Sequence, residues 1–482
     1  MFLGMGKGII IMKVLFIYIV DSGDIFHKTS SNKPIYSNSE IHFGISYLSA
    51  YLKKYGHKTE LFICSKKTQL NEIKSFINLT KPQMICFSLV YKEYCKTKKI
   101  AAHIKKYFPD IYLICGGVHT TLNPSEIIKE AFDAVCIGEG EFALVELANQ
   151  LKRKMTPSGI PNMWLKHGNK IEKNKTQPFY EPLDNLPFPD REIWEEKIYD
   201  SATAHTVLLG RGCPFGCTYC CNHSLKNISG GQYVRMRSPE NVVEEIKHII
   251  SRYEKVRVIY LEVEAINIDL AYLESLCIEL RSFVKENDLN LSFGANYRII
   301  PSQDVEYIFE VFRLSGIRYV NIGLESGCER IRREIMNRNY SNQNIMDVVK
   351  AARKNRILIR LYVMLGIPEE THEDFLKTIK IVMEINPVDV QLNIFCPYPG
   401  TKLYDYCVEN GYLPKKHIDL GRAIATINYP QYSKKRIQKD FIYFYYLWWK
   451  KKKKKKPYFE YLIFKIKIFS TNFKHFLSNI FN

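Results

Sequence analysis

Several features that would place this chain in a membrane or outside the cell are missing from its 482 residues. No run of residues approaches the roughly 20 uninterrupted apolar positions of a transmembrane helix. The apolar stretch 8–20 is interrupted by Lys13 and lacks a small-residue cleavage site, which is typical of a buried first strand rather than a signal peptide. The 13 cysteines are an odd number and mostly stand alone, unlike a disulfide framework. We therefore predict a cytoplasmic protein in a reducing compartment.

Disorder and a large basic surface are also excluded for most of the chain. Hydrophobic residues make up 46% of the sequence and charged residues 25%, which is ordinary globular composition, and the length fits two or three domains. The formal net charge of +19 is unevenly distributed, because residues 434–482 hold 14 Lys and Arg against 2 Asp and Glu. Since most of the excess lies at one end, we expect no nucleic-acid partner.

The first third of the chain alternates short apolar runs with helical patterns. This alternation predicts an α/β domain over residues 12–150, with a Rossmann-like (flavodoxin-like) parallel sheet covered by helices on both faces. Ligands of such folds bind beyond the carboxyl ends of the strands, where two glycine-containing segments stand, 116–119 and 138–141. The expected strands are 14–19, 60–64, 84–88, 111–115 and 134–137.

A change of composition separates this domain from a second alternating series. Six of the 20 prolines fall between residues 157 and 189, which predicts a proline-rich linker over 151–200. Residues 201–415 then carry six strand patterns separated by helical ones, which predict a partial (β/α)6 barrel of the TIM type. The expected strands are 205–209, 256–261, 291–295, 319–323, 360–365 and 388–394.

The most specific signal is a cysteine loop after the first strand of the barrel. Cys213, Cys217 and Cys220 have C-x3-C-x2-C spacing, and the glycines and proline among them make a tight loop that can turn its thiolates inward. Soft thiolates at this density suit an iron–sulfur cluster or zinc. A closed zinc site needs a fourth ligand, and Cys221 is too close to Cys220 to join it on one cluster. A zinc knuckle and merely buried cysteines are the alternatives.

This loop resembles the cysteine loop of radical S-adenosylmethionine (SAM) enzymes, with Tyr219 at the aromatic position before the last cysteine. The resemblance implies that each of the three cysteines binds one iron of a [4Fe–4S] cluster and that SAM chelates the fourth iron. One electron from the cluster then cleaves SAM to a radical that abstracts hydrogen from an unactivated C–H bond. Three later segments also resemble the family: Gly323-Leu324-Glu325-Ser326-Gly327, Gly366-Ile367-Pro368-Glu369-Glu370-Thr371 and Pro397-Tyr398-Pro399-Gly400-Thr401. The first of them adds Gly323, Glu325 and Ser326 to the candidate SAM site.

Two further positions at strand ends of the barrel are candidates for the same site. Where many relatives have an Asp-Asp pair, this chain has Glu262-Val263-Glu264. The two carboxylates lie on one strand face, where they either receive the SAM ammonium group or a substrate, or form a solvated strand edge. Arg298, after the third strand of the barrel, is a candidate partner for the SAM carboxylate or for an acidic neighbour. No residue is singled out as catalytic.

The first domain resembles the cobalamin-binding domain that precedes the barrel in many radical SAM enzymes. The resemblance lies in Gly116-Gly117-Val118-His119-Thr120-Thr121 with Pro124, in Gly138-Glu139-Gly140-Glu141 and in residues 183–189 of the linker. It implies a cobalamin site that includes Gly116, Gly117, His119, Gly138, Glu139 and Gly140, whose glycines let the backbone approach a large flat ligand. A degenerate domain that binds nothing is the alternative.

The His119 ring is not expected to bind cobalt. The Asp-x-His-x-x-Gly motif, which supplies a lower cobalt ligand in other cobalamin proteins, is absent from the sequence. The segment Asp24-Ile25-Phe26-His27 has a different spacing and no glycine three residues later. We expect the ring of His119 to form a hydrogen bond within its own loop.

Residues 416–482 form a basic, aromatic C-terminal segment. Seven consecutive lysines, 450–456, follow Trp448 and Trp449. A helical cap on the barrel is the first interpretation and a peripheral anchor at the inner face of the membrane the second. RNA binding comes third, because the segment has no recognisable RNA module. The apolar face of an anchor would come from Phe464, Ile468, Phe469 and Phe473.

Together these patterns predict a cobalamin (B12)-binding-domain-containing radical SAM enzyme that methylates an unactivated carbon. The expected cofactors are a [4Fe–4S] cluster, SAM and cobalamin. The expected partners are a small-molecule or lipid-like substrate and a one-electron reductant such as flavodoxin or ferredoxin. Two alternatives stay open: a cobalamin-dependent radical rearrangement, cyclisation or oxidation, and a non-catalytic iron–sulfur or cobalamin-binding protein.

Overall fold

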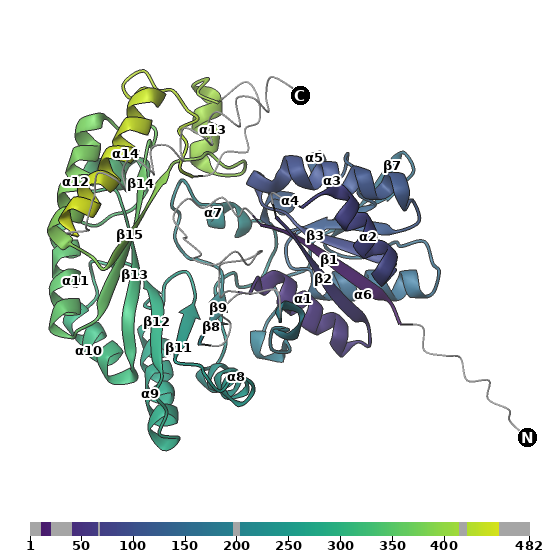
Figure 1. Cartoon of the computed structure of the whole chain (residues 1–482), viewed down its shortest axis with the longest axis horizontal. Coiled ribbons are helices and arrows are strands. Elements are labelled where there is room, and N and C mark those ends of the chain that lie inside the picture. The colour runs from purple at the N-terminus through teal and green to yellow at the C-terminus, as the bar shows by residue number, and fades with distance from the viewer. Residues whose placement is uncertain (1–10, 21–40, 66–67, 196–202, 414–421, 453–482) are drawn as a thin grey trace, which may run out of the picture. The chain divides into compact units, whose positions relative to one another are not determined.

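The computed structural model describes residues 11–20, 41–65, 68–195, 203–413 and 422–452 (Figure 1). These residues divide into two units, each built around its own sheet. Unit 1 contains the described residues up to 195 together with 224–235, and unit 2 contains 203–223 and the described residues from 236 onward.

Unit 1 contains a seven-stranded sheet in the order β2-β1-β3-β4-β5-β6-β7. Strands β1 to β5 are parallel, and their order 2-1-3-4-5 is that of flavodoxin-like folds, as the sequence predicted. Helices α1 and α6 lie together on one face of the sheet, and α2 and α3 lie on the other (Figure 1). The strands are β1 (Lys13–Ile19), β2 (Lys58–Cys64), β3 (Met84–Ser88), β4 (Tyr112–Gly116), β5 (Ala134–Cys136), β6 (Met163–His167) and β7 (Lys170–Lys173). The helices are α1 (Phe43–Lys54), α2 (Leu70–Thr80), α3 (Tyr94–Tyr107), α4 (Val118–Leu122), α5 (Pro124–Ile127) and α6 (Glu141–Lys152).

The segment 151–200 differs from the linker that its prolines suggested. Its strands β6 and β7 extend the first sheet as an antiparallel hairpin, with Val135 of β5 opposite Trp164 of β6. The prolines flank this hairpin on both sides, which agrees with their missing N–H donor, since a strand interior needs that donor for its ladder. The described part of this segment therefore belongs to unit 1.

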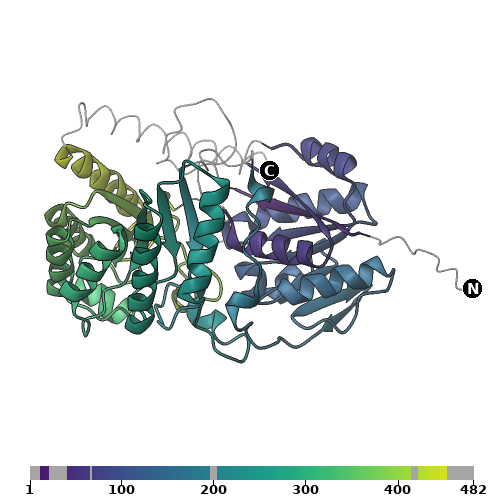
Figure 2. The ribbon, with the colours of Figure 1, turned by 90° about the horizontal axis from the view of Figure 1, so that it is seen from below.

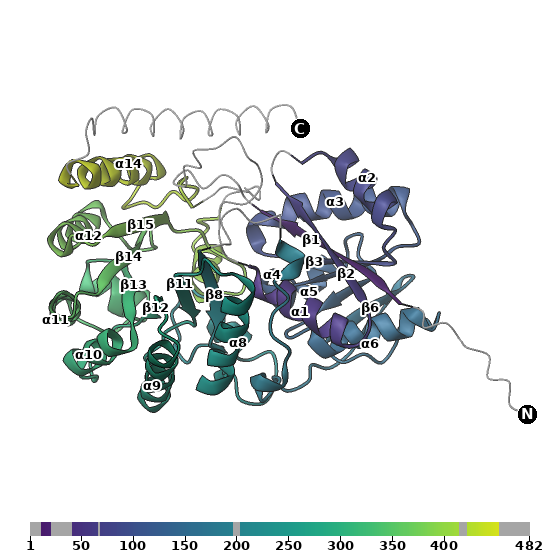
Figure 3. The same cartoon turned by 60° about the horizontal axis from the view of Figure 1, so that its bottom comes forward.

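Unit 2 contains six parallel strands in sequential order, β8-β11-β12-β13-β14-β15, which is the partial (β/α)6 barrel that the sequence predicted. The connecting helices lie along the outer face of this sheet (Figures 2 and 3). The strands are β8 (Ala204–Leu208), β11 (Val258–Glu262), β12 (Ser292–Tyr297), β13 (Ile317–Glu325), β14 (Leu358–Leu365) and β15 (Asp389–Ile394), and the short strands β9 (Gly210–Arg211) and β10 (Arg235–Met236) lie outside this sheet. The helices are α7 (Asn222–Leu225), α8 (Pro239–Arg252), α9 (Leu270–Glu286), α10 (Val305–Ser315), α11 (Asn342–Lys354), α12 (His372–Ile385), α13 (Lys402–Glu409) and α14 (Lys434–Lys451).

The two faces of the second sheet differ in polarity. Ile259 and Leu261 of β11 are fully buried in the core under the helices. Tyr260 and Glu262 alternate with them, so they point to the opposite, concave face. On β12 the same alternation places Asn296 on the concave face. Because the side chains on one face of each strand pack into the apolar core under the helices, polar side chains can lie on the concave face.

Helix α14 packs into the core of unit 2, which agrees with the cap interpretation of the C-terminal segment. Phe441 and Phe444 are fully buried. The Tyr445 hydroxyl accepts a hydrogen bond from Leu392 N of β15 at 3.1 Å. Strand β15 is an edge of the sheet, so this contact satisfies a backbone donor that has no neighbouring strand. Helix α14 thus covers an exposed sheet edge.

The predicted membrane anchor lies largely outside the described residues. The lysines from 453 onward belong to that part, as do Phe464, Ile468, Phe469 and Phe473. In the described part of the chain, no helix is both long and apolar enough to cross a membrane. The segment 24–27 also lies outside the described residues.

Replacing one buried aromatic of α14 is expected to destabilise unit 2. We predict that Phe441→Ala lowers the free energy of unfolding by about 3 kcal/mol, because it leaves a cavity in the core. Tyr443→Ala is the matched control, since Tyr443 is 46% exposed on the same helix. Urea unfolding followed by far-ultraviolet circular dichroism measures both. Equal midpoints for the two variants would contradict a structural role for α14.

Candidate functional site

The three cysteines of the motif lie on one loop at the carboxyl end of the first barrel strand. The loop begins after β9 at Gly212, whose φ of +89° is in the left-handed region that favours glycine. Cys217 is buried, and Cys213 and Cys220 are partly exposed; none forms a disulfide. The loop therefore presents three thiols at the strand ends, where ligands of parallel α/β folds bind.

The end of the π-helical turn Ile331–Ile335 and the two residues after it hold the cysteine loop in place by hydrogen bonds. The Thr218 hydroxyl donates to Ile335 O at 2.6 Å, and Thr218 N donates to Met336 O at 3.3 Å. The Asn337 side chain donates to Gly216 O at 2.9 Å. Sequence reasoning missed this segment, because nothing in its composition marks it as a partner of a loop more than 100 residues earlier.

The strongest connection of the loop is a buried network formed by Tyr219, Glu325 and Arg338. The Tyr219 hydroxyl donates to Glu325 Oε1 at 3.0 Å and accepts from the Arg338 guanidinium at 2.9 Å. Arg338 also pairs with Glu325 at 3.3 Å and donates to Gly323 O at 2.8 Å. Glu325 and Arg338 are less than a tenth exposed, and burial raises the pKa of Tyr219. Arg338 is not among the site residues that the sequence predicted.

Backbone conformation at the end of β13 also depends on this network. Glu325 has φ of +60°, in the left-handed region that is unusual for a residue other than glycine, and the pairing of β13 with β14 shifts register there. A Cβ on Gly323 would lie 2.5 Å from Glu325 Oε1, so a larger residue there would displace the Glu325 carboxylate from its contacts with Tyr219 and Arg338. Residues held in such strained conformations cluster at functional sites, because the surrounding contacts must hold them in place.

Arg298 lies against the cysteine loop. Both of its terminal nitrogens are 3.5 Å from Cys217 Sγ, and its guanidinium stacks over the Phe215 ring at 3.6 Å. The sequence left open whether Arg298 meets the SAM carboxylate or an acidic neighbour. In the structure the guanidinium donates from both terminal nitrogens to the Cys217 sulfur.

Glu262, which ends β11, and Glu264, two residues further on, have different surroundings. Glu264 is exposed and accepts from Asn222 Nδ2 at 3.1 Å, while the same amide nitrogen is 3.5 Å from Cys220 Sγ. Glu262 is partly exposed and accepts from Asn296 Nδ2 at 3.3 Å. Glu264 is therefore connected to the cysteine loop through Asn222, whereas Glu262 is connected to the polar side chains of the concave face.

The thiols of the loop do not share one electrostatic environment. A hydrogen bond from Cys221 lowers the pKa of Cys220 to about 7, and the same bond raises the pKa of Cys221. Burial raises the pKa of Cys213 to about 11. Cys221 therefore acts in this structure as a donor to Cys220.

The donor set of the loop fits an iron–sulfur cluster. Within the described ranges, no three His, Cys, Asp or Glu side chains are grouped closely enough to hold one metal ion. A [4Fe–4S] cluster does not require such a group, since each thiolate binds a different iron. Donors from Arg298 and Asn222 to the sulfurs of Cys217 and Cys220 are the kind of contacts that stabilise cluster thiolates.

Ser326 has a different environment from the other predicted SAM residues. Its side chain is fully buried, and its hydroxyl lies 3.3 Å from the Thr378 hydroxyl and accepts from Cys328 N at 3.2 Å. Next to it, a Cβ on Gly327 would lie 2.5 Å from Thr378 Cα. Both residues therefore support close packing of the end of β13 against α12.

In unit 1, the predicted cobalamin residues lie at the carboxyl ends of β4 and β5. Gly116 ends β4, and Gly117 has φ of +91°; a Cβ on Gly117 would lie 2.7 Å from Leu89 N. Gly138 has φ of +77° and its N–H donates to the Thr121 hydroxyl at 3.0 Å, while Gly140 precedes α6. At Gly116, Gly117, Gly138 and Gly140 an added Cβ would meet neighbouring protein atoms, so these glycines allow close packing at this edge of the sheet.

The Glu139 carboxylate is bound by two groups of unit 1. Its carboxylate accepts from Tyr180 N at 2.7 Å and from the Arg235 guanidinium at 3.0 Å, and the Arg235 side chain is only 3% exposed. Sequence reasoning placed Glu139 among the cobalamin residues and did not identify Arg235. These two contacts connect the loop after β5 to residues 180 and 235.

The His119 ring forms a contact within its own loop, as the sequence predicted. Its Nδ1 lies 3.2 Å from Asn123 Nδ2, and the residue is 3% exposed. The rings of Tyr91 and Tyr94 pack against it edge-on, with centroids 5.2 and 5.4 Å away. His119 is thus enclosed by its neighbours.

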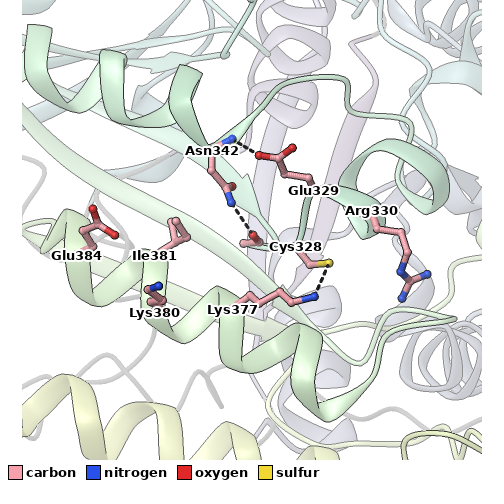
Figure 4. Close-up of a pocket in the computed structure, with 9 residues that line it drawn as sticks. Cys328, Glu329, Arg330, Asn342, Lys377, Lys380, Ile381 and Glu384 are labelled. Atoms are coloured by element: carbon pink, nitrogen blue, oxygen red, sulfur yellow. Dashed lines mark hydrogen bonds between the residues drawn. The ribbon is translucent and has the colours of Figure 1, made fainter.

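A separate hollow of about 420 Å³ lies between the end of β13, the start of α11 and α12 (Figure 4). Figure 4 shows Lys377 pointing toward Cys328 and the Asn342 backbone and side chain bonding to its neighbours. Lys377 and Arg330 both pair with Asp374, at 3.1 and 2.7 Å. The Arg330–Asp374 pair connects the segment after β13 to α12, whereas the Lys377–Asp374 pair lies within α12.

Comparison with known proteins identifies both units. Residues 207–382 match the family model of the radical SAM superfamily, and residues 37–148 match that of the B12 binding domain. An uncharacterized methyltransferase of Pyrococcus horikoshii is 25% identical over 374 residues, which are 77% of this chain and 79% of that protein. An anaerobic magnesium-protoporphyrin IX monomethyl ester cyclase of Rubrivivax gelatinosus is 25% identical over 372 residues, 75% of this chain and 65% of that protein.

A solved structure shares the fold of the chain. The radical SAM methyltransferase TsrM of Kitasatospora setae, with cobalamin and a [4Fe–4S] cluster bound, superposes with a TM-score of 0.64 at 16% identity and covers 83% of this chain and 78% of its own. The radical SAM match includes all three cysteines of the loop, and the B12-binding match includes the glycines at the ends of β4 and β5. The chain therefore belongs to the radical SAM enzymes that carry a B12-binding domain.

Proposed function

We propose that this radical SAM enzyme methylates an unactivated carbon of a small-molecule substrate with the help of cobalamin. The observation that supports this most directly is the three-thiol loop, which Tyr219 connects to the end of β13, in a chain that also has a B12-binding domain. The relatives add support, because one is named a methyltransferase and the structural neighbour TsrM is a methyltransferase with both cofactors bound.

Each unit has a separate part in this proposal. Cys213, Cys217 and Cys220 hold the cluster, and Arg298 donates to the sulfur of Cys217. Glu264, exposed beside the loop, receives the ammonium group of SAM. Once bound, the cluster and cobalamin supply the electron for SAM cleavage and the methyl group. The protein orients these groups and excludes water from them.

The proposed cobalamin site is the edge of the first sheet at the ends of β4 and β5. Gly116, Gly117, Gly138 and Gly140 let the chain pack closely there, because an added Cβ at each would meet protein atoms at 2.7 to 3.6 Å, and this packing shapes the edge that the ligand would meet. The enclosed His119 ring supports its assignment as a structural residue of the loop rather than a cobalt ligand.

A cobalamin-dependent cyclisation or oxidation is the second candidate function. It is favoured by the relative from Rubrivivax gelatinosus, which is named a cyclase and matches 75% of this chain. Both candidate reactions begin with the same reductive cleavage of SAM. Product analysis distinguishes them, because only methylation adds the mass of a methyl group to the substrate.

We further propose a one-electron reductant, such as a flavodoxin or ferredoxin, as the protein partner. Its role follows from the chemistry, because the cluster must be reduced before each cleavage of SAM. Peripheral membrane contact through the basic residues after α14 remains a prediction, and the described part of α14 supports the cap interpretation.

Removing any one cysteine of the loop is expected to abolish SAM cleavage. After anaerobic reconstitution, we expect about four iron and four sulfide per chain and reductant-dependent formation of 5′-deoxyadenosine. Cys213→Ala, Cys217→Ala and Cys220→Ala should each lose this activity. Cys95→Ala in α3 is the control and should retain it. Survival of 5′-deoxyadenosine formation in any loop variant would refute the cluster assignment.

The Tyr219 hydroxyl is expected to affect the rate of cleavage without affecting cluster content. Tyr219→Phe keeps the ring but removes the donor to Glu325, so the loop is held less firmly on β13. We predict a drop of about tenfold in the rate of 5′-deoxyadenosine formation, about 1.4 kcal/mol, with iron content unchanged. Tyr307→Phe, which removes an exposed hydroxyl on α10, is the control. Equal rates for wild type and Tyr219→Phe would show that the contact has no positioning role.

A methyl group at Gly117 is expected to reduce cobalamin binding. The change Gly117→Ala places a Cβ 2.7 Å from Leu89 N at a φ of +91°, so the edge of β4 must distort. Gly168→Ala is a matched control, because Gly168 has φ of +58° in open space. We predict at least tenfold weaker retention of cobalamin by Gly117→Ala only, measured by visible absorbance after gel filtration. Equal retention by the two variants would place the cobalamin site elsewhere.

A further inference from the structure

A row of hydrogen-bonded polar side chains crosses the concave face of the second sheet below the cysteine loop. Tyr260 of β11 donates its hydroxyl proton to Asn296 Oδ1 of β12 at 2.5 Å. Asn321 of β13 donates from Nδ2 to the Tyr260 oxygen at 2.6 Å. Three neighbouring parallel strands therefore each contribute one side chain to a single chain of hydrogen bonds.

The direction of this chain of hydrogen bonds is determined by Asn296 of β12. Asn296 Nδ2 donates to Val263 O at 2.9 Å and to Glu262 Oε1 at 3.3 Å, so the Asn296 carbonyl oxygen must face Tyr260 as an acceptor. The Tyr260 hydroxyl has one proton, which it gives to Asn296. Asn321 must then present its amide nitrogen to Tyr260, and its own carbonyl oxygen points away from the row.

That carbonyl oxygen, Asn321 Oδ1, has no hydrogen-bond donor among the described residues, although it is buried. Asn321 as a whole is 7% exposed. A buried acceptor without a donor is unfavourable, and such atoms in folded proteins usually pair with water or with a ligand. The amide cannot rotate to satisfy it without breaking the contact to Tyr260.

Side chains of β14 that share the concave face with Asn321 are exposed. Arg360 is the register partner of Asn321 and is exposed, and its guanidinium lies 5.1 Å from the centre of the Tyr319 ring. Tyr362, two residues further along β14, is 37% exposed. A ligand that displaces one of these two exposed side chains reaches Asn321 from the concave face.

Asn321 lies further from the carboxyl end of the sheet than the candidate SAM residues do. Asn321 precedes Gly323 by two residues on β13, which places it about 6.6 Å deeper in the sheet. The predicted SAM residues Glu325 and Arg298 lie at or beyond the strand ends. A ligand at Asn321 would therefore lie beneath SAM on the concave face.

We propose that the concave face binds the substrate through an N–H or O–H group that donates to Asn321 Oδ1. The substrate class is then a polar molecule with at least one hydrogen-bond donor, rather than a hydrocarbon lipid. This inference rests on the proposed function, because it concerns the substrate of that reaction. SAM also carries N–H and O–H donors, so the experiment must distinguish SAM from the substrate as the ligand of Asn321 Oδ1.

Equilibrium dialysis of the reconstituted, full-length enzyme tests this inference. One arm uses SAM alone, and the other uses a mixture of nucleosides, N-acetyl amino acid amides and squalene, analysed by mass spectrometry. The variants are Asn321→Leu, which has a similar size but no acceptor, and Asn321→Asp, which keeps an acceptor. Gln343→Leu is the matched control, because Gln343 is an exposed amide on helix α11, away from the concave face. Circular dichroism checks that each variant is folded.

We expect the wild-type enzyme, Gln343→Leu and Asn321→Asp to retain at least one donor-bearing compound. Asn321→Leu should bind that compound at least tenfold more weakly and bind SAM as the wild type does. Selective retention of squalene, or equal retention by wild type and Asn321→Leu, would overturn the inference. Weaker SAM binding by Asn321→Leu would assign the oxygen to the cofactor and overturn it as well. The proposed function fails separately, if the wild type forms no 5′-deoxyadenosine.

Discussion

A buried contact among Tyr219, Glu325 and Arg338 connects the cysteine loop to the end of β13. The loop has little regular structure of its own, so its thiols depend on outside contacts for their positions. Tyr219 lies between Cys217 and Cys220 in the sequence. Because its hydroxyl is hydrogen-bonded to the end of β13, the position of β13 affects where the two cysteines lie. Because Glu325 and Arg338 are buried charges, each needs the other, and the loss of either would leave an unpaired charge in the interior.

The same end of the second sheet gathers the other candidate groups. In parallel sheets all strands end at one edge, so residues far apart in sequence come together there. Arg298 after β12 and Glu264 after β11 reach the cysteine loop in this way. The outer face of each strand is buried under helices, and this division leaves the concave face to polar side chains such as Tyr260 and Asn296.

Much of the fold was predictable, because its signals are local. Short apolar runs alternate with helical patterns in both units, and each expected strand has a counterpart in the structure. The hairpin of β6 and β7 was missed, since the prolines around it dominate the composition of that segment. The packing of α14 on the edge of β15 was only one of three interpretations, because basic and aromatic residues suit both a core and a membrane surface.

The sequence by itself was sufficient to name the candidate residues for the chemistry of this protein. The spacing of Cys213, Cys217 and Cys220, and the glycines at strand ends, are properties of a few adjacent residues and can be interpreted without a structure. Tertiary structure alone decided the partners: Arg338 for Tyr219, the Cys217 sulfur for Arg298, and Arg235 for Glu139. These pairs join residues 81 to 119 positions apart. Local patterns do not specify such contacts, because the contacts form only when the parallel strands bring distant side chains together.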